Sequence, residues 1–415
     1  MTVSNPTRAA SDWPPAVVAG AFQTGVNLMR DLRRRGVDTC CFDCIATQPG
    51  FKSVYGKAHL CPNPDDHPEK WVDFMVALGR RSRLRPVLIS SADQFVTAMA
   101  RHAEILKQYF IFPDTIATQD LLSTKSQQYD IASANGLEVP RTKLCNSWAE
   151  LHEFAESATF PLLIKPVHFR EWFRFPPGHP LLDEKIAVAG NMEELQNIHH
   201  LAAPVTPTLV VQEIIAGPDT AKLVYLSCYA RSGERLAGCV LKELRTMPMN
   251  FGSATIVEPI DDPETDRLCD NFLRRIRYSG ICEIELKRDV RTNAVKLIEV
   301  NPRYSGTGDA SSYVGLEVGW LHYLDLIGEP VAPVSPTNPK LHHIVLKRDF
   351  ACYRSYLKAG LCTWSDLIGS YRPPVAFFDF DPMDWRVSLD TCIECFKALA
   401  APTYRRFFPK RKPQA

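Results

Sequence analysis

A chain of 415 residues is too long for one ordinary hydrophobic core, so two or three domains are expected. Lys and Arg number 48 against 47 Asp and Glu, and the formal charge of +1 excludes a global field that would attract nucleic acid. No apolar run approaches the roughly 18 residues of a membrane span, and the first residues lack the apolar core of a signal peptide. A cytoplasmic location is therefore expected.

Residues 1–15 are rich in Pro, Ser and Ala, which predicts a disordered leader. The thirteen cysteines are odd in number and have no scaffold-like spacing, which favours reduced thiols. Cys41 and Cys44 form a C-x-x-C, typical of redox or half of a zinc site, but no second pair at ligand spacing follows. Structural or incidental cysteines are the favoured interpretation.

Residues 16–120 have the pattern of a Rossmann-like domain. An apolar run at 16–19, a helical pattern ending near Gly36 and a second apolar run predict a β-turn-α-β unit, and a similar unit begins near Pro86. Gly20 and Gly25 do not form G-x-G-x-x-G, so a dinucleotide site is disfavoured here.

The pattern changes from residue 121. Helical and strand-like segments alternate in the manner of an α+β domain over 121–330, whereas four prolines after residue 329 predict a linker or long loop. An amphipathic helix is predicted at 385–400. The basic residues that follow it are interpreted as a solvated terminus.

The most informative segment is 281–303, where two apolar-rich runs flank Arg291-Thr292-Asn293. Asn tolerates a left-handed conformation, so a hairpin turn centred on Thr292 is predicted. That register places Glu285 opposite Glu299. Because strand side chains alternate, Glu283, Asn301 and Arg303 share the same face.

Opposed Cβ atoms in a hairpin lie about 4.5–5.5 Å apart, where two bare carboxylates repel each other. A hard divalent cation between them would relieve the repulsion, since magnesium prefers carboxylate and amide oxygens. The alternative is a solvated strand face whose charge is neutralised by Lys287. Spacing alone leaves both interpretations open.

Glu-Ile-Glu-Leu-Lys and Leu-Ile-Glu-Val-Asn-Pro-Arg resemble the metal-binding end of ATP-grasp enzymes, in particular the D-aspartate ligase-like and carbamoyl-phosphate-synthase-like branches. The resemblance covers most of the chain through five motifs in order, among them Ser90-Ser91-Ala92-Asp93 and Ile164-Lys165-Pro166. It implies an α/β and α+β multidomain protein. A Rossmann-like pre-ATP-grasp domain (16–120) would precede an ATP-grasp fold (121–330) whose two α+β subdomains enclose ATP, with a central lid subdomain at about 140–212 and a C-terminal extension at 331–415.

The resemblance also implies roles for individual residues. The residues that would bind ATP are Lys125 and Lys165 at its phosphates, Gln212, Glu213, Ile214 and Ile215 at the adenine, and Asp219 at the ribose. The residues that would bind Mg²⁺, with Mn²⁺ as a substitute, are Glu285, Glu299 and Asn301. The cationic residues that would stabilise the transferred phosphoryl group are Arg303, Arg245 and Lys242; a solvated strand end is the alternative for the last two.

One segment departs from the family. Where the family has a small-residue, glycine-bearing loop, residues 168–180 are bulky and aromatic. They would have to use His168, Arg170 or Arg174 at the phosphates. We expect this segment to be loosely packed without nucleotide and to close over it as a lid.

The function implied by the resemblance is an ATP-dependent carboxylate–amine ligase that forms an acyl-phosphate and releases ADP and phosphate. Its partners would be a small carboxylic acid and an amine, such as amino acids, with no nucleic acid; a homodimer stays open. The alternatives are an ATP-grasp kinase or carboxylase, and a non-catalytic nucleotide-binding regulatory protein.

Overall fold

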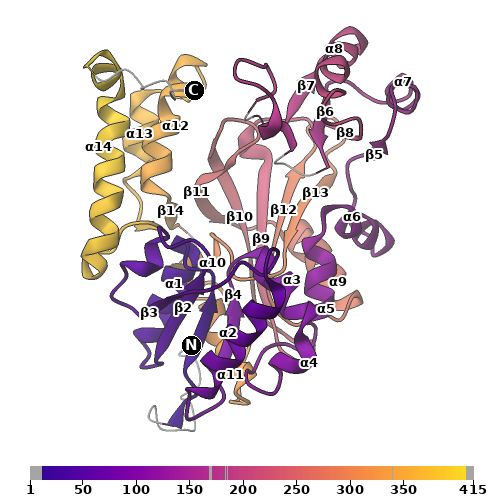
Figure 1. Ribbon diagram of the computed structural model, residues 1–415. Helices are drawn as coiled ribbons and strands as arrows, with labels where there is room; N and C mark the ends of the chain where they lie inside the picture. Colours follow the sequence, from indigo (N-terminus) through magenta and orange to yellow (C-terminus); the bar gives the residue numbers. More distant parts are fainter. Residues whose placement is uncertain (1–11, 168–170, 183, 185, 339, 408–415) are drawn as a thin grey trace. The chain divides into compact units, whose positions relative to one another are not determined.

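The computed structural model describes residues 12–167, 171–182, 184, 186–338 and 340–407. Residues 1–11 of the predicted leader lie outside the described residues. Three β-sheets are present, and the chain divides into two compact units (Figure 1). The larger unit comprises residues 1–137, 218–286 and 299–415, and the smaller unit comprises residues 138–217 and 287–298.

The larger unit begins with a parallel sheet of strand order β3-β2-β1-β4, as the N-terminal pattern predicts. Short apolar strands and amphipathic crossover helices produce this arrangement because each helix covers an apolar face of the sheet. The strands are β1 (Ala16–Ala19), β2 (Thr39–Asp43), β3 (Lys57–Leu60) and β4 (Val87–Ser90). The helices of this region are α1 (Gln23–Arg33), α2 (Pro68–Arg80), α3 (Asp93–Arg101), α4 (Ala103–Leu106), α5 (Ile116–Ser123) and α6 (Lys125–Ala134).

A seven-stranded sheet has the order β13-β12-β9-β10-β11-β14-β15. Its strands are β9 (Lys222–Tyr229), β10 (Arg235–Met247), β11 (Ser253–Ile260), β12 (Gly280–Arg288), β13 (Val295–Asn301), β14 (His342–Ile344) and β15 (Val375–Phe377). The helices that follow β11 are α9 (Pro263–Arg275), α10 (Gly308–Val314), α11 (Val318–Leu326), α12 (Leu346–Lys358), α13 (Trp364–Ser370) and α14 (Trp385–Phe407).

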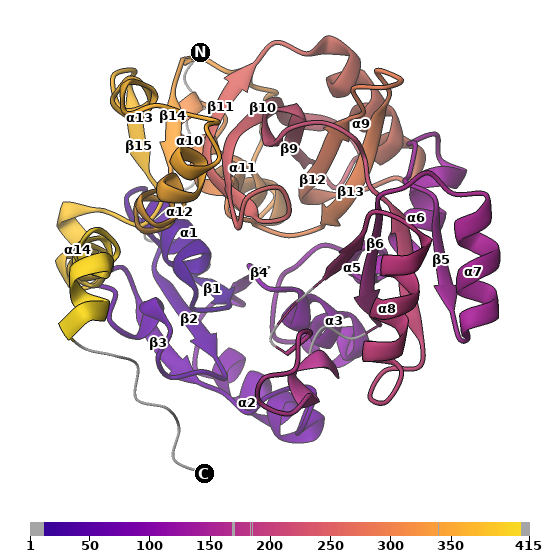
Figure 2. The same ribbon diagram turned by 90° about the horizontal axis from the view of Figure 1, so that it is seen from above.

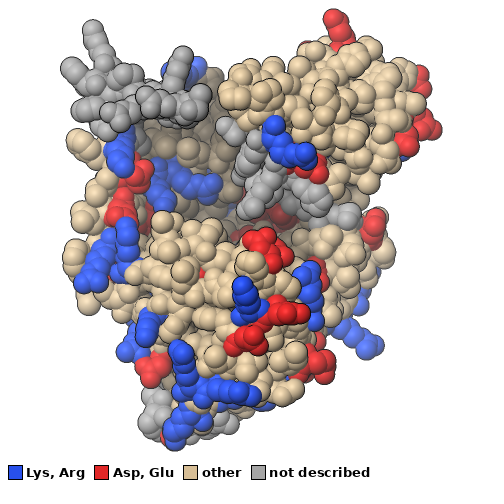
Figure 3. Space-filling model, in the orientation of Figure 1, with Lys and Arg blue, Asp and Glu red and all other residues tan. Residues whose placement is uncertain are grey.

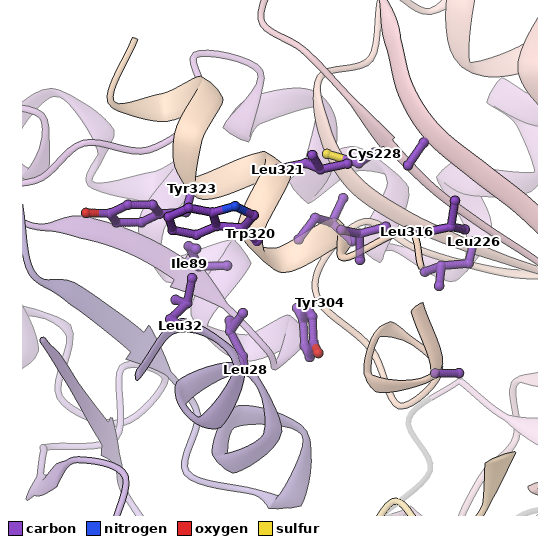
Figure 4. Close-up of a cluster of buried hydrophobic side chains, with 14 of the residues drawn as sticks. Leu28, Leu32, Ile89, Leu226, Cys228, Tyr304, Leu316, Trp320, Leu321 and Tyr323 are labelled. Atoms are coloured by element: carbon purple, nitrogen blue, oxygen red, sulfur yellow. The ribbon is translucent and has the colours of Figure 1, made fainter. Parts of the chain in front are cut away.

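One hydrophobic core joins the two sheets of the larger unit. Leu28 and Leu32 of α1 and Ile89 of β4 pack with Leu226 of β9 and Leu321 of α11 (Figure 4). All five side chains are at most 4% exposed. Burial of apolar surface on this scale fixes the parallel sheet against the larger sheet, and with it the segment that joins β13 to α10.

The C-terminal region belongs to the same unit. Residues 331–338 form the predicted loop, after which β14 pairs with β11 and extends the seven-stranded sheet. Helix α14 packs along α12 (Figure 2). The helix predicted at 385–400 is thus present and extends to Phe407.

The smaller unit contains an antiparallel sheet of order β5-β8-β6-β7 and two helices. Its strands are β5 (Thr142–Cys145), β6 (Leu162–Pro166), β7 (Ala187–Ala189) and β8 (Leu209–Glu213), and its helices are α7 (Trp148–Glu156) and α8 (Met192–Ala202). Ser147 and Asn191 cap the two helices by accepting hydrogen bonds from backbone N–H groups, which explains where the helices begin.

The aromatic segment of the smaller unit differs from its prediction. Trp172 is fully buried and Phe175 is 5% exposed, and both pack in the core of this unit beside Leu181. The expectation of a loosely packed segment is therefore wrong at Trp172 and Phe175, because their aromatic side chains supply core volume. His168 and Arg170 lie outside the described residues, and lid closure stays a prediction.

Acidic and basic side chains are interspersed on the face shown in Figure 3, in line with the small net charge. Within the described part of the chain, no helix combines the length and the apolar character that crossing a membrane requires.

Candidate active site

The hairpin of β12 and β13 has the turn that the sequence predicts. Asn293 adopts a left-handed φ of 61°, and its N–H donates to the carbonyl of Asp289 at 2.7 Å. Asp289 accepts further hydrogen bonds from Arg291 at 2.8–3.0 Å, and these hold its pKa well below its usual range. A short polar turn that satisfies its own backbone therefore joins the two strands. The direct opposition of Glu285 and Glu299 stays a prediction.

Oxygen-bearing side chains of the hairpin lie close together. The side-chain amide of Asn301 donates to Glu283 at 2.9 Å and to Glu285 at 3.2 Å. Glu283 also accepts hydrogen bonds from Ser305, at 2.6 Å, and from Thr307. The alternation argument is therefore confirmed for these three hairpin residues, which come together as predicted.

The carboxylate of Glu285 is the electrostatic centre of this cluster. Burial raises its pKa well above the usual range, and the charges of Glu299, Glu283 and Glu243 raise it further, while Lys222 lowers it. Several carboxylates are thus close enough to oppose one another's ionisation. A cation would bind favourably at a site of this kind, because its positive charge would offset the repulsion among the carboxylates.

Arg303 lies beside the cluster and is held in place by two residues. Its guanidinium donates to both oxygens of Asp93, at 2.6 and 2.8 Å, and to the side-chain oxygen of Asn301 at 3.0 Å. Asp93 is in the first turn of α3, so the N-terminal region positions this arginine. A paired guanidinium retains a fixed orientation, which suits recognition of carboxylate or phosphate.

The structure does not bring Arg245 and Lys242 to the cluster. Arg245 is 5% exposed and donates two hydrogen bonds to Asp349 and one to Ser370, each at 2.9 Å. Lys242 lies opposite Glu258 in the register of β10 and β11. Because strand side chains alternate, the Lys242 side chain is on the other face of the sheet from that of Glu243. The guanidinium of Arg245 thus links β10 to α12 and α13, which the sequence pattern could not indicate.

Two candidate nucleotide-binding residues belong to the larger unit. Lys125 begins α6, and its side chain is outside the described residues. Asp219 is buried: it forms an ion pair with Lys222 at 3.0 Å and accepts hydrogen bonds from the Asn250 N–H, at 3.0 Å, and the Tyr356 hydroxyl. Burial raises the pKa of Asp219, but these three partners outweigh burial and lower it. The predicted ribose contact would have to compete with them.

The other nucleotide-binding candidates belong to the smaller unit. Lys165 and Gln212 share the sheet face opposite the hydrophobic core, and the Gln212 amide donates to Thr142 at 2.9 Å. Glu213 accepts a hydrogen bond from the Thr159 N–H at 2.8 Å. Lys165 is thus a half-buried residue on the face of the sheet away from the core.

The backbone that follows β8 is partly engaged within the smaller unit. The N–H of Ile214 donates to the carbonyl of Pro161 at 3.4 Å, and its carbonyl accepts from Arg291 at 3.4 Å. Ile215 is 8% exposed. Adenine recognition by Ile214 and Ile215 stays a prediction.

Sequence reasoning missed three residues that act on the cluster. Lys222 and Glu243 alter the pKa of Glu285, and Asp93 holds Arg303. Strand alternation one position beyond Lys242 could have indicated Glu243. Within the described residues, no group of three or more His, Cys, Asp and Glu side chains is arranged as a metal site, so the amide of Asn301 is needed to complete the predicted set.

Comparison with known proteins shows which proteins the chain resembles. No protein-family profile matches the chain. D-aspartate ligase of Enterococcus faecium is 24% identical over 241 residues, which are 55% of this chain and 55% of that protein. The arginine-specific large chain of carbamoyl phosphate synthase from Geobacillus stearothermophilus is 25% identical over 230 residues, 51% of this chain and 21% of that one. The chain thus spans about half the length of the first of these relatives.

Solved structures share the fold at low identity. N5-carboxyaminoimidazole synthetase from Staphylococcus aureus, complexed with ADP, has a TM-score of 0.62 and 13% identity, covering 84% of this chain and 86% of that one. L-amino acid ligase from Bacillus licheniformis has a TM-score of 0.56 and 14% identity, covering 76% and 75%. The biotin carboxylase domain of Hydrogenobacter thermophilus 2-oxoglutarate carboxylase, in complex with MgADP, has a TM-score of 0.57 and 15% identity, covering 76% and 70%.

These comparisons bear out the predicted resemblance to ATP-grasp enzymes, and the solved structures share the fold of this chain. The resemblance and the fold class predicted from the sequence are confirmed. The roles predicted for individual residues and the four-segment division of the chain stay predictions.

We predict that Arg245→Met destabilises the fold. The substitution would leave the fully buried Asp349 without its bidentate partner, which costs about 3–5 kcal/mol. The free energy of unfolding in urea, followed by circular dichroism, measures the loss. Lys242→Met is the matched control on the same strand and should cost far less. Equal, small losses in both variants would contradict the structural role of Arg245.

A second prediction concerns Glu285→Gln. The raised pKa of Glu285 means that its charge lowers stability at neutral pH, so without divalent cations the variant should melt a few degrees above the wild type, at about 2–4 °C per kcal/mol gained. The difference should vanish below about pH 4.5, the ordinary pKa of a glutamate, and grow as pH rises above it. Scanning calorimetry measures both.

Glu234→Gln, at an exposed turn, is the control for removing one negative charge. Added Mg²⁺ should raise the melting temperature of the wild type and of the control, and raise that of Glu285→Gln less. A variant that melts below the wild type at neutral pH without cations would show that the carboxylates do not repel.

Proposed function

We propose that this protein is an ATP-dependent ligase that joins a carboxylic acid to an amine through an acyl-phosphate and releases ADP and phosphate. The observation that carries the proposal is the convergence of Glu283, Glu285 and Asn301 beside Glu299 and Arg303 in an ATP-grasp fold. Relatives that are ligases, and structural neighbours that contain ADP, support it.

The donor set fits magnesium. Carboxylate and amide oxygens are the ligands that Mg²⁺ prefers, and it usually shares them with substrate phosphates. Glu285, Glu299 and Asn301 would hold it. In the structure the Asn301 amide nitrogen faces two carboxylates and its oxygen accepts from Arg303, so Asn301 would have to turn its amide to offer oxygen to a cation.

ATP would supply the phosphoryl group that activates the acid. Its phosphates would meet Lys125 and Lys165, whose compact charges suit phosphate. Gln212, Glu213, Ile214 and Ile215 would lie along the adenine, and Asp219 near the ribose. A structural neighbour solved in complex with MgADP supports the binding of Mg²⁺ together with ATP.

The chemistry asks a carboxylate to approach the γ-phosphate of ATP, so two anions must be brought together. Positive groups must neutralise that charge while the reactants are held in line. Arg303, held by Asp93 and lying beside Asn301, would supply one of these positive groups. The amine then attacks the activated carbonyl and phosphate leaves, so no covalent bond to the protein is needed.

The substrates would be a small carboxylic acid and an amine. Two of the similar proteins, D-aspartate ligase and L-amino acid ligase, favour amino acids among them. Carboxylation is the second candidate reaction, because two structural neighbours are a carboxyaminoimidazole synthetase and a biotin carboxylase domain. Supplying bicarbonate in place of the carboxylic acid, with the amine kept as acceptor, separates the two reactions by the mass of the product.

We predict that turnover yields ADP and inorganic phosphate, because the acyl-phosphate route cleaves ATP at the γ-phosphorus. Chromatography of the nucleotide products, with acids screened against amines and mass detection of the amide, measures this. AMP and pyrophosphate among the products would indicate an adenylating enzyme and overturn the proposal.

We also predict that Glu299→Gln keeps the fold but lowers turnover by on the order of a hundredfold or more, because it removes one negative ligand of the metal. The apparent Mg²⁺ requirement should rise as well. Initial rates over a Mg²⁺ series measure both effects, with Glu234→Gln as the charge-matched control. Wild-type activity at low Mg²⁺ in the Glu299 variant would contradict the assignment of this hairpin.

A further inference from the structure

Helix α14 has three distinct faces. One face is buried against the rest of the larger unit and carries Val387, Ser388, Thr391 and Cys395, all at most 8% exposed. These positions recur at the spacing of one helical face. Contact with α12 accounts for this face, so the helix is fixed to the protein and its other sides face outward.

The second face is polar and has no net charge. Arg386 and Lys397 are basic, whereas Asp390 and Glu394 are acidic. Asp390 forms an ion pair with Lys52, and Glu394 forms one with Lys397 at 2.7 Å. This face is that of an ordinary solvated helix.

The third face is apolar and exposed. Trp385 is 58% exposed, Leu389 52%, Ile393 43% and Phe396 72%. Their spacing of four, four and three residues aligns them along one side of the helix, between the buried and the polar faces. Scattered apolar residues on a surface need no explanation, but a continuous row of four large side chains does.

The sequence after this apolar stripe is strongly basic. Residues 398–415 contain five Lys and Arg and no Asp or Glu, whereas the whole chain carries a formal charge of only +1. Residues 1–397 therefore carry −4. The sequence that follows the apolar stripe thus carries the net positive charge of the chain.

We propose that the stripe of Trp385, Leu389, Ile393 and Phe396, together with the basic residues after it, binds the surface of a lipid bilayer that contains anionic lipid. An amphipathic helix that lies in the interface inserts its apolar side chains among the acyl chains, and neighbouring Lys and Arg residues gain about 1 kcal/mol each near an anionic surface. Stable attachment needs two such signals, and this region supplies both.

Other occupants fit the observations less well. A second copy of the chain would bring two segments of charge +5 together, and their repulsion would oppose pairing through the stripe. A nucleic acid would use the basic residues but would leave four large apolar side chains without a role. The proposal is independent of the ligase chemistry, because no residue of the stripe contacts the carboxylate cluster described above.

The test is sedimentation of the full chain with two kinds of vesicle, one of phosphatidylcholine alone and one that also contains phosphatidylserine. We expect binding to the anionic vesicles in about 0.1 M salt, with much less in about 0.5 M salt or on phosphatidylcholine alone. Leu389→Gln combined with Phe396→Gln should weaken binding by about tenfold or more. Leu361→Gln, at a 63% exposed position outside the stripe, should leave it unchanged.

A third variant tests the charges by replacing five basic residues with Gln, with an expected loss of about fivefold for each charge that reaches the surface. The replaced residues are Arg405, Arg406, Lys410, Arg411 and Lys412. Circular dichroism and ATP turnover without vesicles should match the wild type in every variant, because the altered residues lie outside the candidate active site.

Absence of binding to anionic vesicles would overturn the proposal. Binding that survives the double stripe substitution would also overturn it. A wild-type dimer that becomes monomeric in the stripe variant, seen by light scattering, without vesicle binding would assign the stripe to contact between copies. Binding of an oligonucleotide that depends on the five basic residues, in the absence of vesicle binding, would reject the lipid surface as well.

Discussion

Repulsion among carboxylates on one face of the β12–β13 hairpin is the constraint on which the rest of this structure depends. Burial and three neighbouring carboxylates push the pKa of Glu285 well above its usual range. The fold keeps them together by donating hydrogen bonds to Glu283 from Asn301, Ser305 and Thr307. A chain selected only for stability would gain from neutral residues at these positions, because buried carboxylates that repel one another are costly. The proposed magnesium site would relieve this repulsion.

The surrounding structure fixes the position of this cluster. The turn at Asn293 sets the strand register, and the hydrophobic core of Figure 4 joins the N-terminal sheet to the seven-stranded sheet. That junction lets Asp93 reach Arg303 and hold it beside Asn301. On the C-terminal side, the Arg245–Asp349 ion pair ties α12 to β10. Carboxylates of the N-terminal and C-terminal regions thus hold arginines of the larger unit in place.

The hairpin could be predicted from the sequence because its information is local. Two apolar runs, one Asn at the turn and alternation along each strand were sufficient to bring Glu285 and Asn301 together. The contacts that the sequence could not indicate are long-range: Asp93 and Arg303 are 210 positions apart, and Arg245 and Asp349 are 104 apart. The same limit explains why Trp172 and Phe175 were expected in a loose lid. Their spacing resembles neither a helix nor a strand, and only tertiary packing shows that they fill a core.

The measurement that tests the central claim most directly is a crystal structure of the chain with ADP and Mg²⁺. The account predicts a magnesium ion coordinated by oxygens of Glu285, Glu299 and Asn301, with the Asn301 amide turned so that its oxygen faces the ion. The hydrogen bonds that the Asn301 amide nitrogen donates to Glu283 and Glu285 would then be lost. A complex in which ADP and Mg²⁺ are bound while Asn301 still donates to both carboxylates, and the ion lies elsewhere, would contradict it.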